Sequence, residues 1–354
     1  MGFGYSTTVF GEIVFNTGMV GYTEALTDPS YNGQILTLTY PLVGNYGIPD
    51  LDAVDEDGLS KFFESDMMQI RGLVVHELSQ TASHWNLKIT LDEWMHDEKV
   101  PGISGIDTRA ITKKLTSNGV MMAALVVSDK EIDVEKIKKE LDSITTYNSE
   151  KFMDIVSTKE EKIYGNESQS VVVIDTGAKN AIVRNIRELG YKAIVVPWNT
   201  TYEKVMSYNP KGVVLSSGPG DPQNCPDTID TAKKLIENDI PTLGICLGAQ
   251  IIGIAGNTET YKLKYGHRGQ NKPCVNLETN QVYVTSQNHG YGIKPESLEK
   301  SDFKLWFVNA DDNTVEGIKH NTQRCIAVQF HPEAAPGPFD CKYVFDELKK
   351  LMEK

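Results

Sequence analysis

The chain has 354 residues, of which 40% are hydrophobic and 23% are charged, and its formal net charge is -13. That length favours two domains over a single core. The acidic balance argues against a nucleic-acid surface and against an anionic membrane surface, because both require a basic protein face. No apolar run is long enough to span a membrane, and the first residues lack the charged and apolar regions of a signal peptide.

The cysteines point to a reducing environment. There are five of them, at positions 225, 246, 274, 325 and 341, and no Cys-x-x-Cys pair occurs. An odd number without that spacing predicts neither a disulfide framework nor a zinc site, and we expect no metal in this chain. A cytoplasmic location is therefore expected, where a thiolate nucleophile would survive.

Residues 1–128 are predicted to form a mixed, β-rich domain with a few helices. Runs rich in β-branched and aromatic residues predict strands at 11–15, 34–39, 70–75 and 121–127. Helices are expected at 87–96 and 107–115. The second helix begins at an aspartate or threonine cap and ends near Gly119.

Residues 129–168 are predicted to be a linker that contains one short helix. Charges of both signs crowd residues 129–142, where apolar residues recur at helical spacing. We interpret this stretch as an amphipathic helix with a solvated charged face. Residues 143–168 are polar with little periodicity, so we interpret them as linker.

Residues 169–354 alternate between strands and helices, which predicts a doubly wound α/β domain. Nearly continuous apolar strands are expected at 171–174, 193–196, 212–216 and 243–245. Helices are expected at 180–189, 202–208, 226–238 and after residue 246. Such strands are buried on both faces, so they indicate a parallel sheet with helices on either side. Further strands are predicted at 261–265, 282–285, 305–308 and 326–330, followed by a closing helix at 341–352.

The most informative stretch is Gly244-Ile-Cys246-Leu-Gly248, which joins an apolar strand to an apolar run with helical spacing. It matches a nucleophile elbow, in which a sharp turn lifts the nucleophile out of the sheet. The turn brings backbones close together, so small residues are needed on either side. A helix N-terminus favours a thiolate and offers N–H groups to an oxyanion. We predict that Cys246 is a catalytic nucleophile; the alternative is a buried structural cysteine.

A second strand end carries a base and a carboxylate. In open α/β sheets, sites lie beyond the carboxyl ends of the strands. His331 and Glu333 follow the strand 326–330 and, being two residues apart, point the same way in an extended chain. We interpret His331 as the general base and Glu333 as the group that orients it; the alternative is an ordinary pair of loop residues. His289 is a rival base, less favoured because no carboxylate accompanies it.

A third strand end is rich in glycine. The loop Gly218-Pro-Gly220 follows the strand 212–216 and can present backbone N–H groups at close range. We predict that it forms half of an oxyanion hole, with the Leu247 N–H as the other half. The alternative is a plain turn. The loop lacks the lysine of a P-loop, so ATP binding is not predicted.

Two further segments bear polar groups. Asn288 and the backbone around Gly290 suit an amide or an α-carboxylate ligand. The segment 265–269, which contains His267, is interpreted as a surface or interface loop. The four cysteines other than Cys246 are interpreted as structural.

Three segments in this order resemble the motifs of the class I (triad) glutamine amidotransferases: Ser217-Gly-Pro-Gly-Asp-Pro, Gly244-Ile-Cys-Leu-Gly-Ala-Gln250 and Phe330-His-Pro-Glu333. That family hydrolyses glutamine to glutamate and passes on ammonia. The resemblance implies that Cys246 is the nucleophile and that His331 and Glu333 complete its triad. Ala249 stands where the family usually has histidine. We expect glutaminase chemistry to persist, because that histidine is not the triad base.

The first half resembles the small subunit of carbamoyl-phosphate synthase, a ligase, through residues 11–31, 37–47 and 101–109. The resemblance covers essentially the whole chain, although members usually carry two further strands before residue 11. It implies a heterodimer with a large subunit, or a higher oligomer. Ammonia would pass through a tunnel to that subunit, which would bind ATP and Mg²⁺ and make carbamoyl phosphate from bicarbonate for arginine and pyrimidine biosynthesis. It implies no cofactor in this chain.

The same resemblance implies a set of glutamine contacts that spans both domains. These contacts are Ser30, Gly218, Gly220, Leu247, Gln250, Asn288, Gly290 and Tyr291. Two alternatives to a glutaminase subunit remain. One is a non-catalytic assembly module of the same complex, which the intact triad disfavours. The other is the glutaminase of a different synthase, which the first domain disfavours.

Overall fold

The computed structural model describes residues 1–144 and 146–354. The chain folds into two compact units, Met1–Glu150 and Lys151–Lys354, and each is described by itself. The division falls inside the predicted linker, residues 129–168, of which Thr145 lies outside the described residues. A β-rich first unit and an α/β second unit confirm the predicted fold class.

The first unit is built on a mixed sheet. Its described residues form six paired strands in the order β1-β7-β5-β3-β2-β8. Their bounds are β1 Gly2–Gly4, β2 Thr8–Asn16, β3 Gln34–Leu38, β5 Gly72–Val74, β7 Pro101–Ile103 and β8 Met121–Val126. The four inner strands run parallel, and β1 and β8 pair antiparallel at the edges. The short strands β4 Leu42–Val43 and β6 Glu77–Leu78 form a separate pair.

The helices of the first unit begin at identifiable caps. They are α1 Tyr22–Thr27, α2 Leu91–Asp97, α3 Thr108–Asn118 and α4 Val134–Ser143, with 3-10 turns η1 Pro29–Tyr31 and η2 Tyr147–Ser149. The predicted helix 107–115 is confirmed: Asp107 accepts from the Ala110 N–H, and Gly119 has φ 89° at the C-cap. The prediction for 87–96 is wrong at its start. There, Thr90 and Glu93 form a capping box that begins α2 at Leu91.

The second unit contains a long sheet that combines parallel and antiparallel strands. Its described strands follow the order β15-β14-β16-β17-β18-β13-β12-β10-β11-β9. Their bounds are β9 Lys162–Tyr164, β10 Ser170–Asp175, β11 Lys192–Pro197, β12 Gly212–Leu215, β13 Thr242–Ile245, β14 Thr260–Asn276, β15 Gln281–Ile293, β16 Phe303–Asn309, β17 Val315–His320 and β18 Cys325–Val328. Strands β11, β10, β12, β13 and β18 run parallel, which confirms the parallel sheet predicted for the first four of them.

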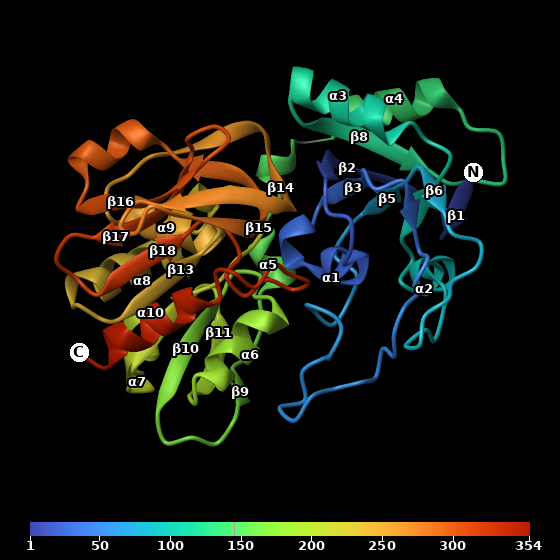
Figure 1. Cartoon of the computed structure of the whole chain (residues 1–354). Helices are drawn as coiled ribbons and strands as arrows, with labels where there is room; N and C mark the ends of the chain where they lie inside the picture. The colour runs from blue at the N-terminus through green and yellow to red at the C-terminus, as the bar shows by residue number, and fades with distance from the viewer. Residues whose placement is uncertain (145) are drawn as a thin grey trace. The chain divides into compact units, whose positions relative to one another are not determined.

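Helices cover both faces of the parallel strands. They are α5 Met153–Val156, α6 Asn180–Glu188, α7 Tyr202–Ser207, α8 Pro226–Glu237, α9 Leu247–Ala255 and α10 Tyr343–Met352, with 3-10 turns η3 Pro222–Asn224 and η4 Pro295–Lys300. Figure 1 shows α10 in front of these strands and α8 and α9 behind them. Because β10 pairs with both β11 and β12, the winding reverses at β10, and ligands bind at such a switch point in open α/β sheets.

Three sequence predictions need correction. The segment 143–168 is not without structure, because it contains α5 and the edge strand β9, which pairs antiparallel with β11. Strand β17 was not predicted, since buried Glu316 and Gly317 interrupt its apolar pattern. Residues 265–269 are not a surface loop: they lie within β14, and His267 and Arg268 are buried.

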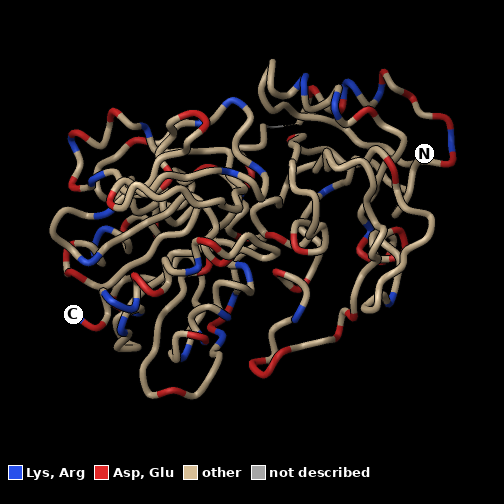
Figure 2. Tube along the Cα trace, viewed as in Figure 1, with Lys and Arg blue, Asp and Glu red and all other residues tan. Residues whose placement is uncertain are grey.

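Charges of opposite sign are mixed along the surface segments. Helix α4 has no buried residue and carries ion pairs between Lys136 and Glu140 and between Lys138 and Glu135. Its charged residues are visible in Figure 2, and they confirm the predicted solvated face. Among the described residues, none of the helices has the length and apolarity that crossing a bilayer demands.

Candidate active site

Cys246 lies at a strained turn between β13 and α9. Its backbone has φ 54° and ψ -104°, outside the regions that L-residues ordinarily adopt. Two backbone hydrogen bonds hold the turn. The Cys246 N–H donates to the Val328 carbonyl (2.9 Å), and the Gly248 N–H donates to the Ser216 carbonyl (3.0 Å). Strain that is fixed by neighbouring strands is typical of a functional residue.

The two glycines of the elbow are sterically required. A Cβ atom on Gly244 would lie 2.6 Å from the Gly248 carbonyl oxygen. A Cβ atom on Gly248 would lie 2.2 Å from the Leu215 carbonyl oxygen. Both distances are far below a van der Waals contact, so the predicted need for small residues is confirmed.

His331 and Glu333 are brought together in a buried position. The Nδ1 atom of His331 lies 2.6 Å from Glu333 Oε1, and both side chains are almost fully buried. The His331 N–H donates to the Ser286 carbonyl of β15 (2.9 Å), which fixes the backbone. A carboxylate at Nδ1 keeps a proton on that nitrogen and turns Nε2 toward the reacting group.

The Cys246 side chain interacts with the imidazole of His331. Nε2 of His331 is buried and makes no hydrogen bond of good geometry to any described residue. Burial alone would lower the pKa of His331, but the charges of Glu333 and Cys246 outweigh it and raise that pKa to about 10. This direction favours the charged form of the imidazole, which suits it to pair with a thiolate. Catalytic hydrogen bonds are often poorly aligned before substrate binds.

A lysine that the sequence analysis missed completes this group. Lys179 is buried, and its Nζ lies 3.2 Å from Glu333 Oε1 and donates to the Ala334 carbonyl (2.6 Å). Burial alone would raise the pKa of Glu333, but the charges of Lys179 and His331 lower it to about 2. Lys179 follows β10 at the same sheet edge, so an inspection of that fourth strand end would have revealed it.

The loops after β10 and β12 are tied together beside the elbow. Thr176 Oγ1 donates toward the Ser216 and Ser217 carbonyls, both at 3.0 Å. Asp175 accepts from the Gly177 and Ala178 N–H groups, and this turn leads into Lys179. A Cβ atom on Gly218 would lie 1.9 Å from the Thr176 carbonyl oxygen, so only glycine fits there.

The geometry is compatible with the predicted oxyanion donors. The second and third N–H groups of α9 are already used, by Ser216 for Gly248 and by Cys246 for Ala249. The first N–H group, that of Leu247, is the one assigned to the oxyanion from the sequence. Gly220 has φ 90° and packs against Phe152. The roles of Gly218, Gly220 and Leu247 stay predictions.

Strand β15 brings a further predicted residue to the nucleophile. The Cys246 Sγ lies 3.6 Å from the Asn288 carbonyl, to which the thiol donates. Gln250 is buried, and its Nε2 donates to the Tyr291 carbonyl (2.9 Å) and to Gln329 Oε1 (3.1 Å), so this amide clamps α9 to β15. Gly290 lies between Asn288 and Tyr291 in the same strand. Their contacts with glutamine stay predictions.

Ser30 belongs to the first unit, within η1. Its N–H donates to Asp28 Oδ1 (2.9 Å), and its Oγ is buried without a hydrogen-bond partner among the described residues. A buried hydroxyl without a partner is available to form a hydrogen bond with a bound ligand. The contact between Ser30 and glutamine stays a prediction.

The rival base His289 has a different environment from His331. Its Nδ1 lies 2.7 Å from the Tyr291 carbonyl and its Nε2 lies 3.2 Å from Gln287 Oε1. Burial, helped by the charges of His267 and Arg268, holds the pKa of His289 well below its usual range. Neither ring nitrogen of His289 is hydrogen-bonded to a carboxylate, so His289 lacks the environment of a triad base.

The other four cysteines lie in apolar surroundings. All are buried and free. Burial raises the pKa of Cys225 and of Cys341 to about 12, and it also raises the pKa of Cys274 and Cys325. Thiols held in the neutral form are poor nucleophiles, which agrees with a structural role for these four cysteines.

Comparison with known proteins gives the class of this site. Residues 172–351 match the family model of glutamine amidotransferase class-I, which includes the elbow, His331 and Glu333. Residues 1–125 match the model of the carbamoyl-phosphate synthase small chain, CPSase domain. The second unit is thus a class I glutamine amidotransferase domain.

Similarity to curated proteins extends over the full chain. The chain is 46% identical to a carbamoyl phosphate synthase small chain of Pyrococcus furiosus, covering 99% of this chain and 94% of that protein. It is 45% identical to one of Fusobacterium nucleatum (99% and 94%) and 43% identical to one of Methanopyrus kandleri (98% and 93%). The chain belongs to the carbamoyl-phosphate synthase small-chain family.

Proposed function

We propose that this chain is the glutamine-hydrolysing subunit of carbamoyl-phosphate synthase. It converts L-glutamine to glutamate and ammonia at Cys246 and delivers the ammonia to a large subunit. That subunit binds ATP and Mg²⁺ and forms carbamoyl phosphate from bicarbonate, for arginine and pyrimidine biosynthesis. The glutaminase step itself uses only side chains and backbone groups of this chain.

The reaction proceeds through a thioester. The Cys246 thiolate attacks the side-chain carbonyl carbon of glutamine, and N–H groups at Leu247 and Gly218–Gly220 hold the oxyanion. The C–N bond then breaks as the His331 imidazolium gives its proton to the departing ammonia. Water, deprotonated by the now neutral His331, attacks the thioester and releases glutamate and the Cys246 thiolate.

One observation carries this proposal. A strained elbow cysteine lies against an imidazole whose other nitrogen is held 2.6 Å from a buried carboxylate. Nucleophile, base and orienting group are the three parts that covalent amide hydrolysis requires. Lys179 forms an ion pair with the Glu333 carboxylate, and that carboxylate keeps the imidazole charged and oriented.

The test is glutamate release by purified protein. Replacing Cys246 by alanine is expected to reduce the rate by about 10⁴-fold or more, because the covalent route is lost. Cys325→Ala is the matched control. Cys325 is also buried, but it lies at the amino end of β18, opposite the elbow edge, and its variant is expected to keep its rate. Undiminished glutamate release by Cys246→Ala would contradict the proposal.

The partner is tested separately. The chain is co-purified with a carbamoyl-phosphate synthase large subunit, and glutamine-dependent carbamoyl phosphate is measured. The wild-type chain is expected to support carbamoyl phosphate formation from glutamine. The Cys246→Ala chain is expected to support it only when free ammonia is supplied. Glutaminase activity without any coupled product would place the chain with another synthase. Coupled assembly without any glutaminase activity would make it an assembly module.

The cellular location belongs to the same proposal. The five cysteines are free, and the nucleophile works as a thiolate. A reducing cytoplasm keeps them so. Oxidation of Cys246 would end glutamine hydrolysis, because a sulfenate cannot attack the amide.

A further inference from the structure

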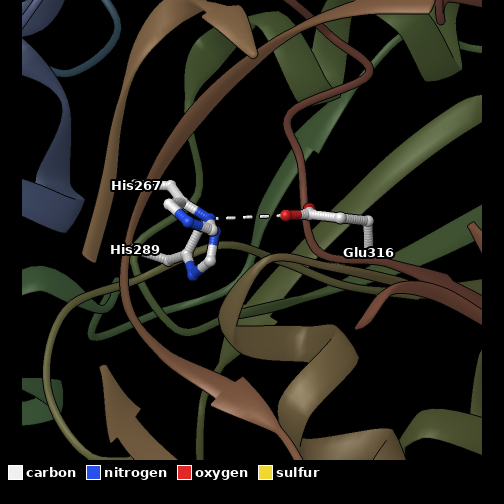
Figure 3. Close-up of side chains that lie close together, drawn as sticks. All are labelled: His267, His289 and Glu316. Carbon is white, nitrogen blue, oxygen red and sulfur yellow. Dashed lines mark ion pairs between the residues drawn. The ribbon is translucent and has the colours of Figure 1, made fainter. Parts of the chain in front are cut away.

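A second buried group of ionisable side chains lies in the antiparallel part of the sheet. His267 of β14, His289 of β15 and Glu316 of β17 converge there, and their ligand atoms lie within 4.8 Å of one another. Figure 3 shows both imidazoles and the carboxylate turned toward a common point. The rings of His267 and His289 meet edge to face, with centroids 5.1 Å apart. The glutaminase reaction makes no use of His267 or Glu316.

The outer nitrogen of each imidazole is held by an acceptor. His289 Nδ1 lies 2.7 Å from the Tyr291 carbonyl, and His267 Nε2 lies 2.8 Å from Asp312 Oδ2. A carbonyl and a carboxylate only accept, so both of these nitrogens carry protons. In a neutral ring the remaining nitrogens, His267 Nδ1 and His289 Nε2, then carry lone pairs. Metal-binding histidines show this pattern, with the far N–H bonded to a carboxylate or a backbone carbonyl.

Two inner atoms of the cluster lack hydrogen-bond donors, whereas Glu316 Oε1 accepts from Asn309 Nδ2 (3.0 Å). His267 Nδ1 and Glu316 Oε2 are buried and have no hydrogen-bond partner among the described residues. The nearest approach between these two side chains is 3.4 Å, from His267 Nδ1 to Glu316 Oε1. A buried polar atom without a hydrogen-bond partner destabilises the fold, so these atoms are suited to bind a cation.

Gln287 places another acceptor oxygen beside this cluster of acceptor atoms. Its Nε2 donates to Thr285 Oγ1 (3.1 Å), whose own hydrogen is donated to the Lys272 carbonyl (2.8 Å). This arrangement fixes the Gln287 amide so that Oε1 faces His289 Nε2 at 3.2 Å. Two lone pairs at that distance repel each other, and a positive charge beside them would remove the repulsion.

From these contacts we infer that His267, His289 and Glu316 form a binding site for a divalent transition-metal ion of the zinc type. Two imidazoles and one carboxylate are a common zinc ligand set. Ligand atoms about 2.0–2.1 Å from a tetrahedral ion lie about 3.4 Å apart, which matches the His267–Glu316 separation. Gln287 Oε1 or a water molecule would supply the fourth ligand. The inference is independent of the proposed glutaminase function.

A metal there would tie three strands together beside the catalytic thiol. The ligands come from β14, β15 and β17, and the residue before His289 is Asn288, whose carbonyl accepts from Cys246. The ion would therefore act as a structural brace of β15. It would touch neither the substrate nor the reacting atoms.

The experiment measures zinc bound to the purified full-length chain. The protein is stripped with a chelator, exchanged into metal-free buffer and titrated with Zn²⁺ against a chromophoric chelator, and retained metal is counted by elemental analysis. Cys246→Ala serves as the background, because the catalytic thiol and His331 form another zinc-binding pair. One tightly held equivalent in both the wild type and Cys246→Ala is expected, together with a higher Tm when zinc is added.

Variants in this background locate the ion. His267→Gln and Glu316→Gln are expected to lose the tightly bound zinc ion. Asp312→Asn is partly exposed and does not itself ligate, so it is expected to fold and to weaken zinc binding about 10–100-fold. His320→Gln, a histidine of β17 outside the cluster, is the control and is expected to keep full affinity. Substituting Co²⁺ should give the visible absorption of a tetrahedral site in the background and in His320→Gln alone.

Two outcomes would overturn the inference. One is a folded Cys246→Ala protein that retains no zinc and shows no change in Tm. The other is a zinc ion that the Cys246→Ala protein binds with unchanged affinity after His267→Gln or Glu316→Gln is added. Either result would mean that a proton, and not a metal, supplies the positive charge at His267 and His289.

Discussion

Lys179 and Glu333 form a fully buried ion pair, with 3.2 Å between Nζ and Oε1, at the back of the proposed catalytic triad. The lysine follows the first parallel strand of the second unit along the chain, and the glutamate follows the last. Because Glu333 also binds His331, the cation acts on the imidazole through the carboxylate. Lys179 is thus a positioning residue.

Lys179→Met is expected to destabilise the protein and to impair glutamine hydrolysis. Removing one partner of a buried ion pair leaves an uncompensated charge and costs about 3–5 kcal/mol. The pKa of Glu333 should rise, since the charge of Lys179 helps to lower it. Urea unfolding and glutamate release are the measurements. Lys233→Met on the exposed face of α8 is the control, and equal stability of the two variants would argue against the positioning role.

His331 should make stability depend on pH in the alkaline range. Its folded pKa of about 10 lies above the ordinary value of 6.5, so its charge stabilises the fold fully below pH 6.5. That contribution is lost as the pH rises through 10. The difference in unfolding free energy between the wild type and His331→Asn is therefore expected to shrink from pH 6.5 to 10. His96→Asn, which replaces an exposed histidine, serves as the control.

Glu333→Gln should move the titration of His331 to lower pH. The carboxylate is the largest of the contributions that raise the pKa of His331, whereas burial lowers it. Without that charge, the imidazole should lose its proton at a lower pH than in the wild type. Nitrogen NMR of the His331 ring measures this midpoint directly. An unchanged midpoint would show that Cys246 alone maintains the imidazolium.

Gly248→Ala should abolish the elbow, whereas Gly292→Ala should be tolerated. The added methyl at Gly248 would meet the Leu215 carbonyl oxygen at 2.2 Å, but at Gly292 the nearest atom would be 3.7 Å away. Forcing β12 and α9 apart should cost about 1–3 kcal/mol and misplace the thiol. Thermal unfolding and glutaminase assays test both variants. Full glutaminase activity in Gly248→Ala would contradict the close backbone contact.

A glutamine-analogue electrophile should label one cysteine per folded chain at neutral pH. Thiolates react and thiols do not, and burial holds the pKa of Cys225 and Cys341 at about 12. Intact-mass spectrometry should show one adduct in the wild type and none in Cys246→Ala. Labelling at several positions in the folded protein would show that burial does not protect the other thiols.

The parts of the site that the sequence revealed share one property: their residue types are informative by themselves. A cysteine between glycines, and a histidine two positions before a glutamate, stand out at the ends of apolar strands. The carbonyl of Asn288 does not, because every residue has one. Lys179 resembled a surface lysine, since its partner Glu333 lies far away in the sequence.

The errors in the fold prediction have a similar cause. Strand β17 and the residues around His267 carry buried charges, which a pattern-based analysis assigns to the surface. Contacts between residues distant in sequence compensate these charges, such as those of His267 with Asp312 and Glu316. The parallel strands were predicted well because nothing polar interrupts them. The local pattern of apolar residues was therefore sufficient to predict the parallel strands. It was not sufficient for the antiparallel strands, where buried charges are paired with residues distant in sequence.

The connection from Lys179 to the Ala334 carbonyl has a consequence for synthesis of the protein. Cys246 is translated well before His331, its proposed base, and Lys179, which pairs with Glu333, is translated earlier still. A ribosome-bound chain therefore carries a thiol without a functioning triad until the last parallel strand has emerged and paired. Under the proposed mechanism, glutamine hydrolysis therefore requires a complete second unit.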